Sequence, residues 1–263
     1  MSQFADATAV TDRGDGTYAA HIDPSWSIGG NPNGGYLLAM LTRAAVSISG
    51  HPDPVAVSGH FLQSPEPGEA AAVRLELLKT GRTVGTVSAL LTQHDRPMVQ
   101  AVVTCAQLPP AGAADYRDLI EPELPPVEQC VVRPVTTPSG RPVELTERLQ
   151  IRLHPDDVGW MSEQPSGQMS MRAWVRLADL TPPDPTVAML AADVLPPSTY
   201  GVGRLGWAPT VQLSVLLRGV PAPGWLKVAT RARLLAGGWF DEEAEVWDSA
   251  GRLVVQSRQL ARG

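Results

Sequence analysis

The sequence predicts an α+β fold made of two similar units, each with an antiparallel sheet wrapped around one buried helix. Two observations carry this prediction. Each half of the chain has an apolar, helix-like segment that precedes four strand-like segments. The turns between those strands also recur at a constant spacing, as a tandem repeat requires.

The helix of the first unit is predicted over residues 37–49, ending at Gly50. Because this segment is apolar on nearly every side, other structure must surround it. A membrane span needs about 20 apolar residues, so the segment is too short to be one. We therefore expect a buried central helix and no membrane span.

Asn33, Gly34 and Gly35 precede this helix and form a possible ligand-binding end. Asparagine is a good helix cap, and glycine lets a ligand approach the backbone closely. The first amides of a helix have no helical partner and can hold a carbonyl oxygen or an anion. The alternative, that the glycines only shape a tight loop, stays open at this point.

Strand-like segments lie at residues 55–62, 71–79, 83–92 and 98–108, and again at 143–153, 169–177, 210–217, 226–234, 240–247 and 253–260. The second helix is predicted from Asp184, a cap followed by proline, to Leu195, before Pro196 and Pro197. Residues 109–142 hold eight prolines and indicate a linker. The expected division is residues 1–108, the linker 109–142, and residues 143–263.

The repeat itself is visible in the turn residues. Pro65 and Gly68 recur as Pro221 and Gly224, and 221 minus 65 gives an offset of 156 residues. The same offset relates Ser58 to Ser214 and brings every turn of the first meander onto a turn of the second. Chance matches would not align all the turns, so we infer a duplicated unit.

Composition excludes several classes of function. The net charge is −6 with only 18% charged residues, so nothing indicates a general nucleic-acid-binding protein. Cys105 and Cys130 have no metal-ligand spacing, and we expect neither a metal nor a cofactor. Two cysteines make no disulfide framework, and the N-terminus lacks the features of a signal peptide, so we expect a cytoplasmic protein.

Neither a dinucleotide-binding motif nor a nucleophile elbow is supported by the sequence. Residues 201–206 match a dinucleotide-binding fingerprint, but they follow a helix and lead into a strand, the reverse of the required order. No G-x-S-x-G motif occurs, so there is no nucleophile elbow of the α/β-hydrolase kind.

Three segments of the second half resemble the bacterial acyl-CoA thioesterase II group: Leu190-Ala191-Ala192-Asp193, residues 208–214 (APTVQLS) and residues 250–259 (AGRLVVQSRQ). In the first half, residues 29–35, Phe61-Leu62 and Pro67-Gly68 resemble the N-terminal part of the same group. The resemblance implies a double hotdog fold and covers nearly all of the chain outside the linker.

The resemblance also implies an activity. In that group a fatty acyl-CoA thioester is hydrolysed by water, without a covalent intermediate, and the residues that hold the water fall on Asp193, Thr210 and Gln259. The amide of Gly34 or Gly35, beside Asn33, would hold the thioester carbonyl. The implied partner is acyl-CoA, and the implied assembly is a homo-oligomer, a dimer of double hotdogs.

The residues themselves support Asp193 independently. It is the only charged residue between Asp184 and Arg204, and an unpaired carboxylate in an apolar helix is costly to bury. Negative charge near a helix C-terminus is also unfavourable. The alternative is that Asp193 lies on an exposed last turn, whereas Thr210 and Gln259 depend mainly on the resemblance.

Two other functions stay open. A hotdog hydratase or dehydratase acting on enoyl or hydroxyacyl thioesters usually needs a histidine with an aspartate, and no histidine follows Asp193. A non-catalytic acyl-CoA-binding protein is the other alternative. We expect one composite site per chain, because the repeat offset relates Thr210 to Pro54 and Gln259 to Val103, whose side chains cannot orient water.

Overall fold

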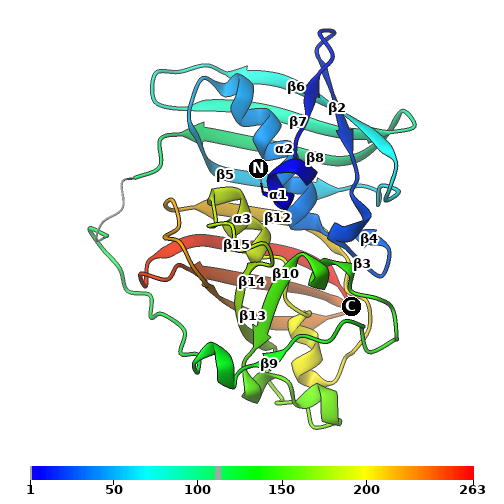
Figure 1. Ribbon diagram of the computed structural model, residues 1–263, viewed down its shortest axis with the longest axis vertical. Helices are drawn as coiled ribbons and strands as arrows, with labels where there is room; N and C mark the ends of the chain where they lie inside the picture. Colours follow the sequence, from blue (N-terminus) through cyan, green and yellow to red (C-terminus); the bar gives the residue numbers. More distant parts are fainter. Residues whose placement is uncertain (1, 110–113) are drawn as a thin grey trace.

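The strands form one continuous antiparallel sheet in the computed structural model, which describes residues 2–109 and 114–263. The sheet has 13 strands in the order β1-β2-β6-β7-β8-β5-β12-β15-β14-β13-β11-β10-β9 (Figure 1). A separate two-stranded ribbon, β3-β4, precedes the first long helix.

The elements of the first half are α1 (Gln3–Ala7), β1 (Thr11–Asp12), β2 (Thr17–His21), β3 (Ser27–Ile28), β4 (Asn31–Pro32), α2 (Gly34–Ser49), β5 (Asp53–Phe61), β6 (Ala70–Lys79), β7 (Gly85–Gln93) and β8 (Arg96–Ala106). Those of the second half are β9 (Val131–Val132), β10 (Leu149–Leu153), β11 (Ser170–Leu177), α3 (Pro185–Ala191), β12 (Thr210–Leu217), β13 (Leu226–Ala236), β14 (Trp239–Trp247) and β15 (Leu253–Arg262). Short 3₁₀ helices, among them Ser198–Val202, connect them.

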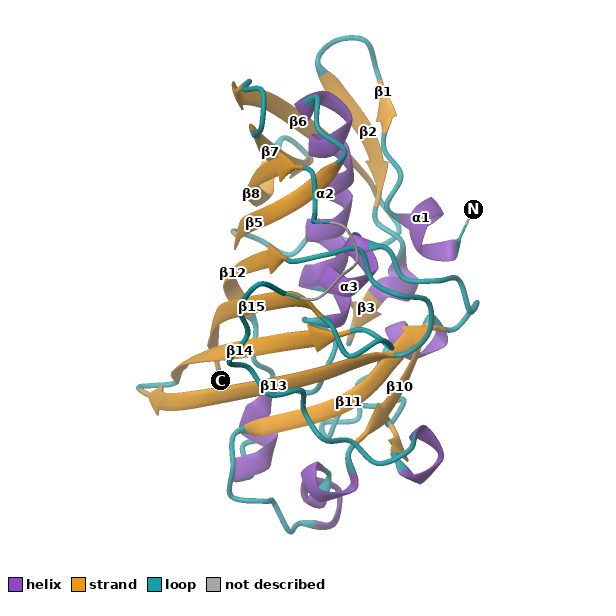
Figure 2. Ribbon diagram, turned by 90° about the vertical axis from the view of Figure 1, so that its left-hand side faces the viewer, coloured by secondary structure: helices purple, strands orange, loops and turns teal. Residues whose placement is uncertain are grey.

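Helix α2 is the buried central helix that its composition predicts. The Asn33 side chain caps it by accepting a hydrogen bond from Tyr36 N at 3.0 Å, and Gly50 ends it with φ +73°. Residues 37–41 are at most 1% exposed. Figure 2 shows α2 and α3 on the same side of the sheet.

Helix α3 begins at its predicted cap, Asp184, but it ends at Ala191 rather than at Leu195. Pro196 and Pro197 explain the difference, because they have no N–H to donate to the carbonyls of Ala192 and Asp193. The Asp193 carbonyl instead accepts a hydrogen bond from Asn33 Nδ2 at 2.7 Å. Asp193 therefore lies just beyond the end of α3.

The expectation of two separate sheets is wrong. Strand β5 pairs with β12, so the sheets of the two units join edge to edge (Figure 1). Ser58 and Ser214, equivalent residues of the repeat, are opposite each other at the centre of this pairing, with their hydroxyl oxygens 3.4 Å apart. Joining satisfies the backbone groups that each strand would otherwise leave unpaired at an edge.

The N-terminal end of each long helix contacts the other helix or the residue just beyond it. The N-terminus of α2 contacts Asp193 just beyond α3, and the N-cap of α3, Asp184, forms an ion pair with Arg43 of α2 at 2.6 Å. One contact is a buried carboxylate at a helix N-terminus and the other is a salt bridge.

The predicted linker is partly structured. Within residues 109–142, strand β9 pairs with β10, and residues 114–126 contain no helix or strand. Residues 110–113 lie outside the described residues. The division of the chain at residues 108 and 143 stays a prediction.

Candidate active site

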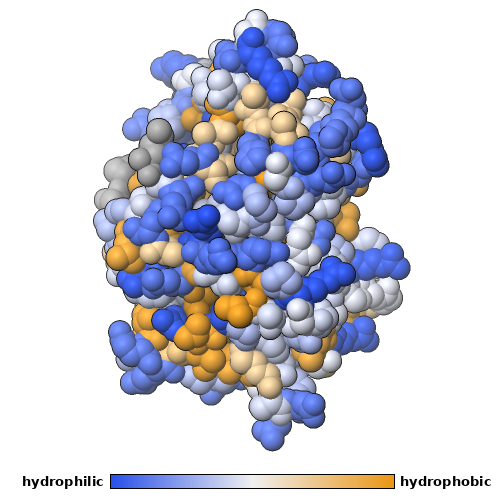
Figure 3. All heavy atoms as spheres, turned by 45° about the vertical axis from the view of Figure 1, so that its right-hand side comes forward, coloured by the Kyte–Doolittle hydropathy of each residue, from blue (hydrophilic) through white to orange (hydrophobic). Residues whose placement is uncertain are grey.

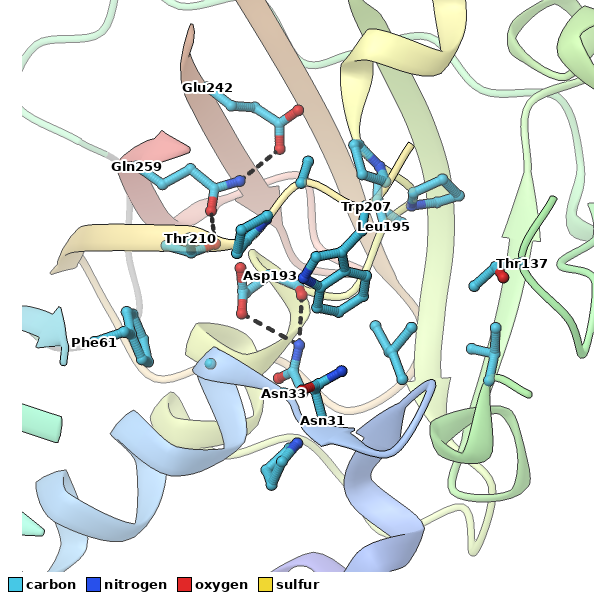
Figure 4. Close-up of a pocket in the computed structure, with 18 of the residues that line it drawn as sticks. Asn31, Asn33, Phe61, Thr137, Asp193, Leu195, Trp207, Thr210, Glu242 and Gln259 are labelled. Carbon is cyan, nitrogen blue, oxygen red and sulfur yellow. Dashed lines mark hydrogen bonds between the residues drawn. The ribbon is translucent and has the colours of Figure 1, made fainter. Parts of the chain in front are cut away.

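A cavity of about 380 Å³ opens beside the N-terminus of α2 and is lined by residues from both units. Five of the six predicted site residues line it: Asn33, Gly34, Asp193, Thr210 and Gln259. Figure 4 shows Asp193 between Asn33 on one side and Thr210 with Gln259 on the other. Gly35, the sixth, is not part of the lining, although its amide takes part in the site.

Asp193 is bound by the first turn of α2. Its Oδ2 accepts hydrogen bonds from Gly35 N at 2.7 Å and from Asn33 Nδ2 at 3.2 Å. The carboxylate is unfavourably placed for α3 but favourably placed for α2, because the N-terminus of a helix attracts negative charge. The α2 end thus offsets part of the electrostatic penalty of burying this group.

The environment nevertheless raises the pKa of Asp193 from 3.8 to about 7. Burial is the largest cause, and the charge of Glu242 acts in the same direction. The hydrogen bonds from Gly35 and Asn33 oppose both by stabilising the carboxylate. A carboxyl group with such a pKa exchanges protons readily near neutral pH, as a general base must.

Thr210 and Gln259 belong to one chain of hydrogen bonds that continues to Glu242. Thr210 Oγ1 donates to Gln259 Oε1 at 2.5 Å, and Gln259 Nε2 donates to Glu242 Oε1 at 2.9 Å. Glu242 Oε2 accepts from Ser198 N at 2.8 Å. Both polar atoms of the Gln259 amide are therefore occupied, and its orientation is determined by Glu242.

Glu242 was not predicted as a site residue from the sequence, although the alternation of its strand indicates a buried acid. Strand β14 alternates, and Phe240, Glu242, Ala244 and Val246 share its buried face, so an acid stands in an apolar row. Glu242 is 5% exposed and lies directly opposite Gln259 in the neighbouring strand. Burial raises its pKa.

Strand irregularity brings Thr210 to the cavity. The β12–β15 pairing shifts register between Thr210 and Gln212, where Thr210 is opposite Ala261 and Gln212 is opposite Leu260. The shift leaves one extra residue in β12, a β-bulge, and a bulge changes the direction in which the neighbouring side chain points. Thr210 thereby contacts Gln259, which the straight register of the strand would not predict.

The glycines at the start of α2 serve close packing as well as the turn. A Cβ on Gly34 would lie 2.9 Å from Asp193 Oδ2 and 2.9 Å from Phe61 Cζ. A Cβ on Gly35 would lie 3.1 Å from the Cα of Leu190 in α3. The other pair, Gly29 and Gly30, has positive φ and forms the turn between β3 and β4.

Two polar atoms where Asp193 meets the N-terminus of α2 have no hydrogen-bond partner in the described part of the chain. One is Asp193 Oδ1, since both bonds to the carboxylate end at Oδ2. The other is the Gly34 amide, because Asp193 takes the Gly35 amide and Asn33 Oδ1 takes that of Tyr36. Of the two glycine amides that the sequence left open, that of Gly35 is thus occupied and that of Gly34 is not, among the described residues.

Neither a metal site nor a membrane-spanning helix is found in residues 2–109 and 114–263. No group of three or more histidine, cysteine or acidic side chains in these residues is arranged to hold a metal ion. None of the helices described there is long and apolar enough to cross a membrane.

Solved structures share this arrangement of strands and helices. The fold superposes with a TM-score of 0.82 on a hot dog fold protein of unknown function from Alicyclobacillus acidocaldarius, at 19% identity, over 100% of this chain and 98% of that chain. A candidate thioesterase II from Thermobifida fusca YX is more similar, with a TM-score of 0.90 and 35% identity over 100% of this chain and 97% of that one. The hotdog part of the fold prediction is thus confirmed.

Family models cover both units. Residues 22–106 match the acyl-CoA thioesterase N-terminal domain, and residues 127–262 match the acyl-CoA thioesterase C-terminal domain. The chain belongs to the acyl-CoA thioesterase family. It is also 33% identical to the uncharacterized protein Rv0499 of Mycobacterium tuberculosis, over 93% of this chain and 90% of that protein.

Proposed function

We propose that the protein hydrolyses acyl-CoA thioesters, with Asp193 as the general base that activates a water molecule. The observation that carries the proposal is the carboxylate of Asp193 at a helix N-terminus that lines a cavity. Its pKa is near 7, and its Oδ1 has no hydrogen-bond partner among residues 2–109 and 114–263. Family membership supports acyl-CoA as the ligand.

The reaction divides between the two halves of the chain. Asp193 Oδ1 accepts a proton as the water oxygen attacks the thioester carbon. The Thr210 hydroxyl, held by Gln259, accepts a hydrogen bond from the same water and orients it. Collapse of the tetrahedral intermediate breaks the carbon–sulfur bond, and the proton taken up by Asp193 passes to the departing thiolate.

The negative charge that develops on the carbonyl oxygen needs a donor, and we assign this role to the Gly34 amide. It is the unclaimed amide of the first turn of α2, where the helix dipole adds to the hydrogen bond. The second half thus supplies the carboxylate, Thr210 and Gln259, and the first half supplies the helix end. This assignment gives one composite site per chain.

The hydratase alternative lacks support at the cavity. No histidine is among the described residues that line it, and Asp193 contacts a helix end rather than an imidazole. Hydration of an enoyl thioester moves protons at two neighbouring carbons, and the described lining offers no histidine to work with Asp193 in such a transfer. The homo-oligomer stays a prediction, since these contacts involve one chain.

The test is release of free CoA thiol from acyl-CoAs of increasing length, measured with a thiol reagent. We expect turnover by the wild type and a loss of roughly 10²–10⁴-fold in kcat for Asp193→Asn, the range typical of a general base. Asp95→Asn is the matched control, because Asp95 lies in an exposed turn with φ 59°, which asparagine tolerates. Wild-type turnover by Asp193→Asn would refute the mechanism, and intact acyl-CoA bound for hours would favour the non-catalytic alternative.

A further inference from the structure

Arg133 brings a buried positive charge to the cavity that no acidic residue neutralises. It is 7% exposed, lines the cavity and has no ion pair in the described part of the chain. Its guanidinium group donates from Nη1 to the carbonyl oxygen of Val194, the residue after Asp193. A guanidinium has five N–H donors, so this single acceptor leaves most of them unused.

Tyr200 adds a second donor at the same place. Tyr200 is 6% exposed, lines the cavity and packs edge-on against Trp160 with ring centroids 5.0 Å apart. No hydrogen bond of its hydroxyl is found within the described residues. Burial raises the pKa of Tyr200 and the nearby charge of Arg133 lowers it, so the two groups interact.

Arg133 keeps its charge at neutral pH in this position. Burial lowers its pKa to about 10, which is still well above 7. A buried, charged group without a counter-ion is costly, and proteins normally pair it or use it to bind a ligand. The cavity around Arg133 therefore fits a ligand that supplies negative charge.

Arg133 and Tyr200 belong to the buried part of the cavity lining. The lining residues Leu62 and Trp207 are 52% and 49% exposed, whereas Arg133, Tyr200 and Phe240 are 2–7% exposed. Figure 3 shows hydrophobic residues gathered at the surface of the lower part of the molecule, which the second half of the chain forms. The large, polyanionic nucleotide part of CoA belongs at an open mouth, so a group that reaches Arg133 is part of the acyl chain.

We propose that the cavity selects acyl-CoAs whose acyl chain ends in a carboxylate, which Arg133 binds together with the Tyr200 hydroxyl. A guanidinium binds a carboxylate through two parallel hydrogen bonds, and the apolar lining, including Leu195 and Phe240, accommodates the methylene groups before it. This inference rests on the proposed thioesterase function for the location of the reacting carbonyl. Arg133 and Tyr200 act here as specificity-determining residues and take no part in the bond-breaking step.

The test compares suberoyl-CoA with octanoyl-CoA, which have the same chain length and differ in the terminal carboxylate. Binding is measured by calorimetry with the Asp193→Asn chain, so that hydrolysis does not interfere. We expect suberoyl-CoA to bind at least about 10-fold more tightly, the size of one charge-assisted hydrogen bond. Adding Arg133→Met should remove this preference and change octanoyl-CoA binding by less than about 3-fold.

Tyr200→Phe is the second variant, because it removes a single oxygen and keeps the contact with Trp160. It should reduce the preference for suberoyl-CoA even if Arg133→Met does not fold. Equal or tighter binding of octanoyl-CoA, or an equal loss for both ligands in the variants, overturns the inference. If the preference is found but the wild type hydrolyses neither ligand, the proposed function fails and this inference stands.

Discussion

Replacing Asp193 by asparagine should stabilise the fold while it removes the activity. The folded protein holds this carboxyl group at a pKa of about 7, against 3.8 for the free group, a difference of about 3 units. Each unit corresponds to about 1.4 kcal/mol, so the carboxylate lowers the free energy of unfolding by roughly 4 kcal/mol above pH 7. Because Asp193 is partly open to the cavity, we take half of this value, roughly 2 kcal/mol, as the minimum effect.

The sign and the pH range follow from the direction of the shift. Below about pH 4, Asp193 is protonated in both the folded and the unfolded protein, and the fold bears no penalty for it. As the pH rises from about 4 through about 7, the free energy of unfolding falls, because the unfolded chain releases this proton more easily than the folded protein does. Asparagine is neutral at every pH, and its side-chain oxygen can still accept from Gly35 and Asn33. The variant should therefore match the wild type near pH 4 and exceed it at pH 8.

Urea unfolding at several pH values measures this difference directly. Asp248→Asn is the matched control, since Asp248 is 1% exposed and contacts between it and Arg252 lower the pKa of its carboxyl group. That variant should lose stability at neutral pH, and the loss should shrink as the pH falls through the lowered pKa of Asp248. Equal stability of Asp193→Asn and wild type at pH 8 would refute the electrostatic reasoning about the site.

Two further variants test the surroundings of Asp193. Glu242→Gln removes a negative charge that raises the pKa of Asp193, so the midpoint of the rise in kcat/KM with pH should move to lower pH, and an unchanged or higher midpoint would contradict this. Gly34→Ala would put a Cβ 2.9 Å from Asp193 Oδ2 and from Phe61, and it should lower kcat by roughly 10²-fold with the fold retained by circular dichroism. Gly219→Ala, where nothing lies within 4 Å of the added atom, is its control, and equal activity of both alanine variants would exclude a role for the Gly34 end.

Helices α2 and α3 and most of the long strands could be predicted because their signals are local. A largely apolar segment of 13 residues requires burial, and a cap with a following proline defines the start of α3. The repeat spacing even identified Ser58 and Ser214 as equivalent residues. It did not predict that they would meet, because strand pairing between units depends on which edges remain unpaired in three dimensions.

The site was harder to predict, since its polar residues come from distant strands and are held by partners outside any motif. Asp193 was identifiable as an isolated charge, and the contact with the α2 end explains how it is tolerated. Glu242 could have been found from the alternation of its strand. Arg133 could not, because residues 109–142 lack periodicity and only the folded chain brings it to the cavity.

A single turnover in water labelled with ¹⁸O, with the protein in excess over acyl-CoA, tests the central proposal most directly. If water activated by Asp193 attacks the thioester, the released acid contains one ¹⁸O atom after the first turnover, and peptides that contain Asp193 keep their unlabelled mass. If Asp193 attacked the carbonyl itself and water then opened the mixed anhydride at the Asp193 carbonyl, the first acid released would be unlabelled and the ¹⁸O would be found in the Asp193 carboxylate. Mass spectrometry of the acid and of the digested protein distinguishes the two results, and label in Asp193 would contradict the mechanism.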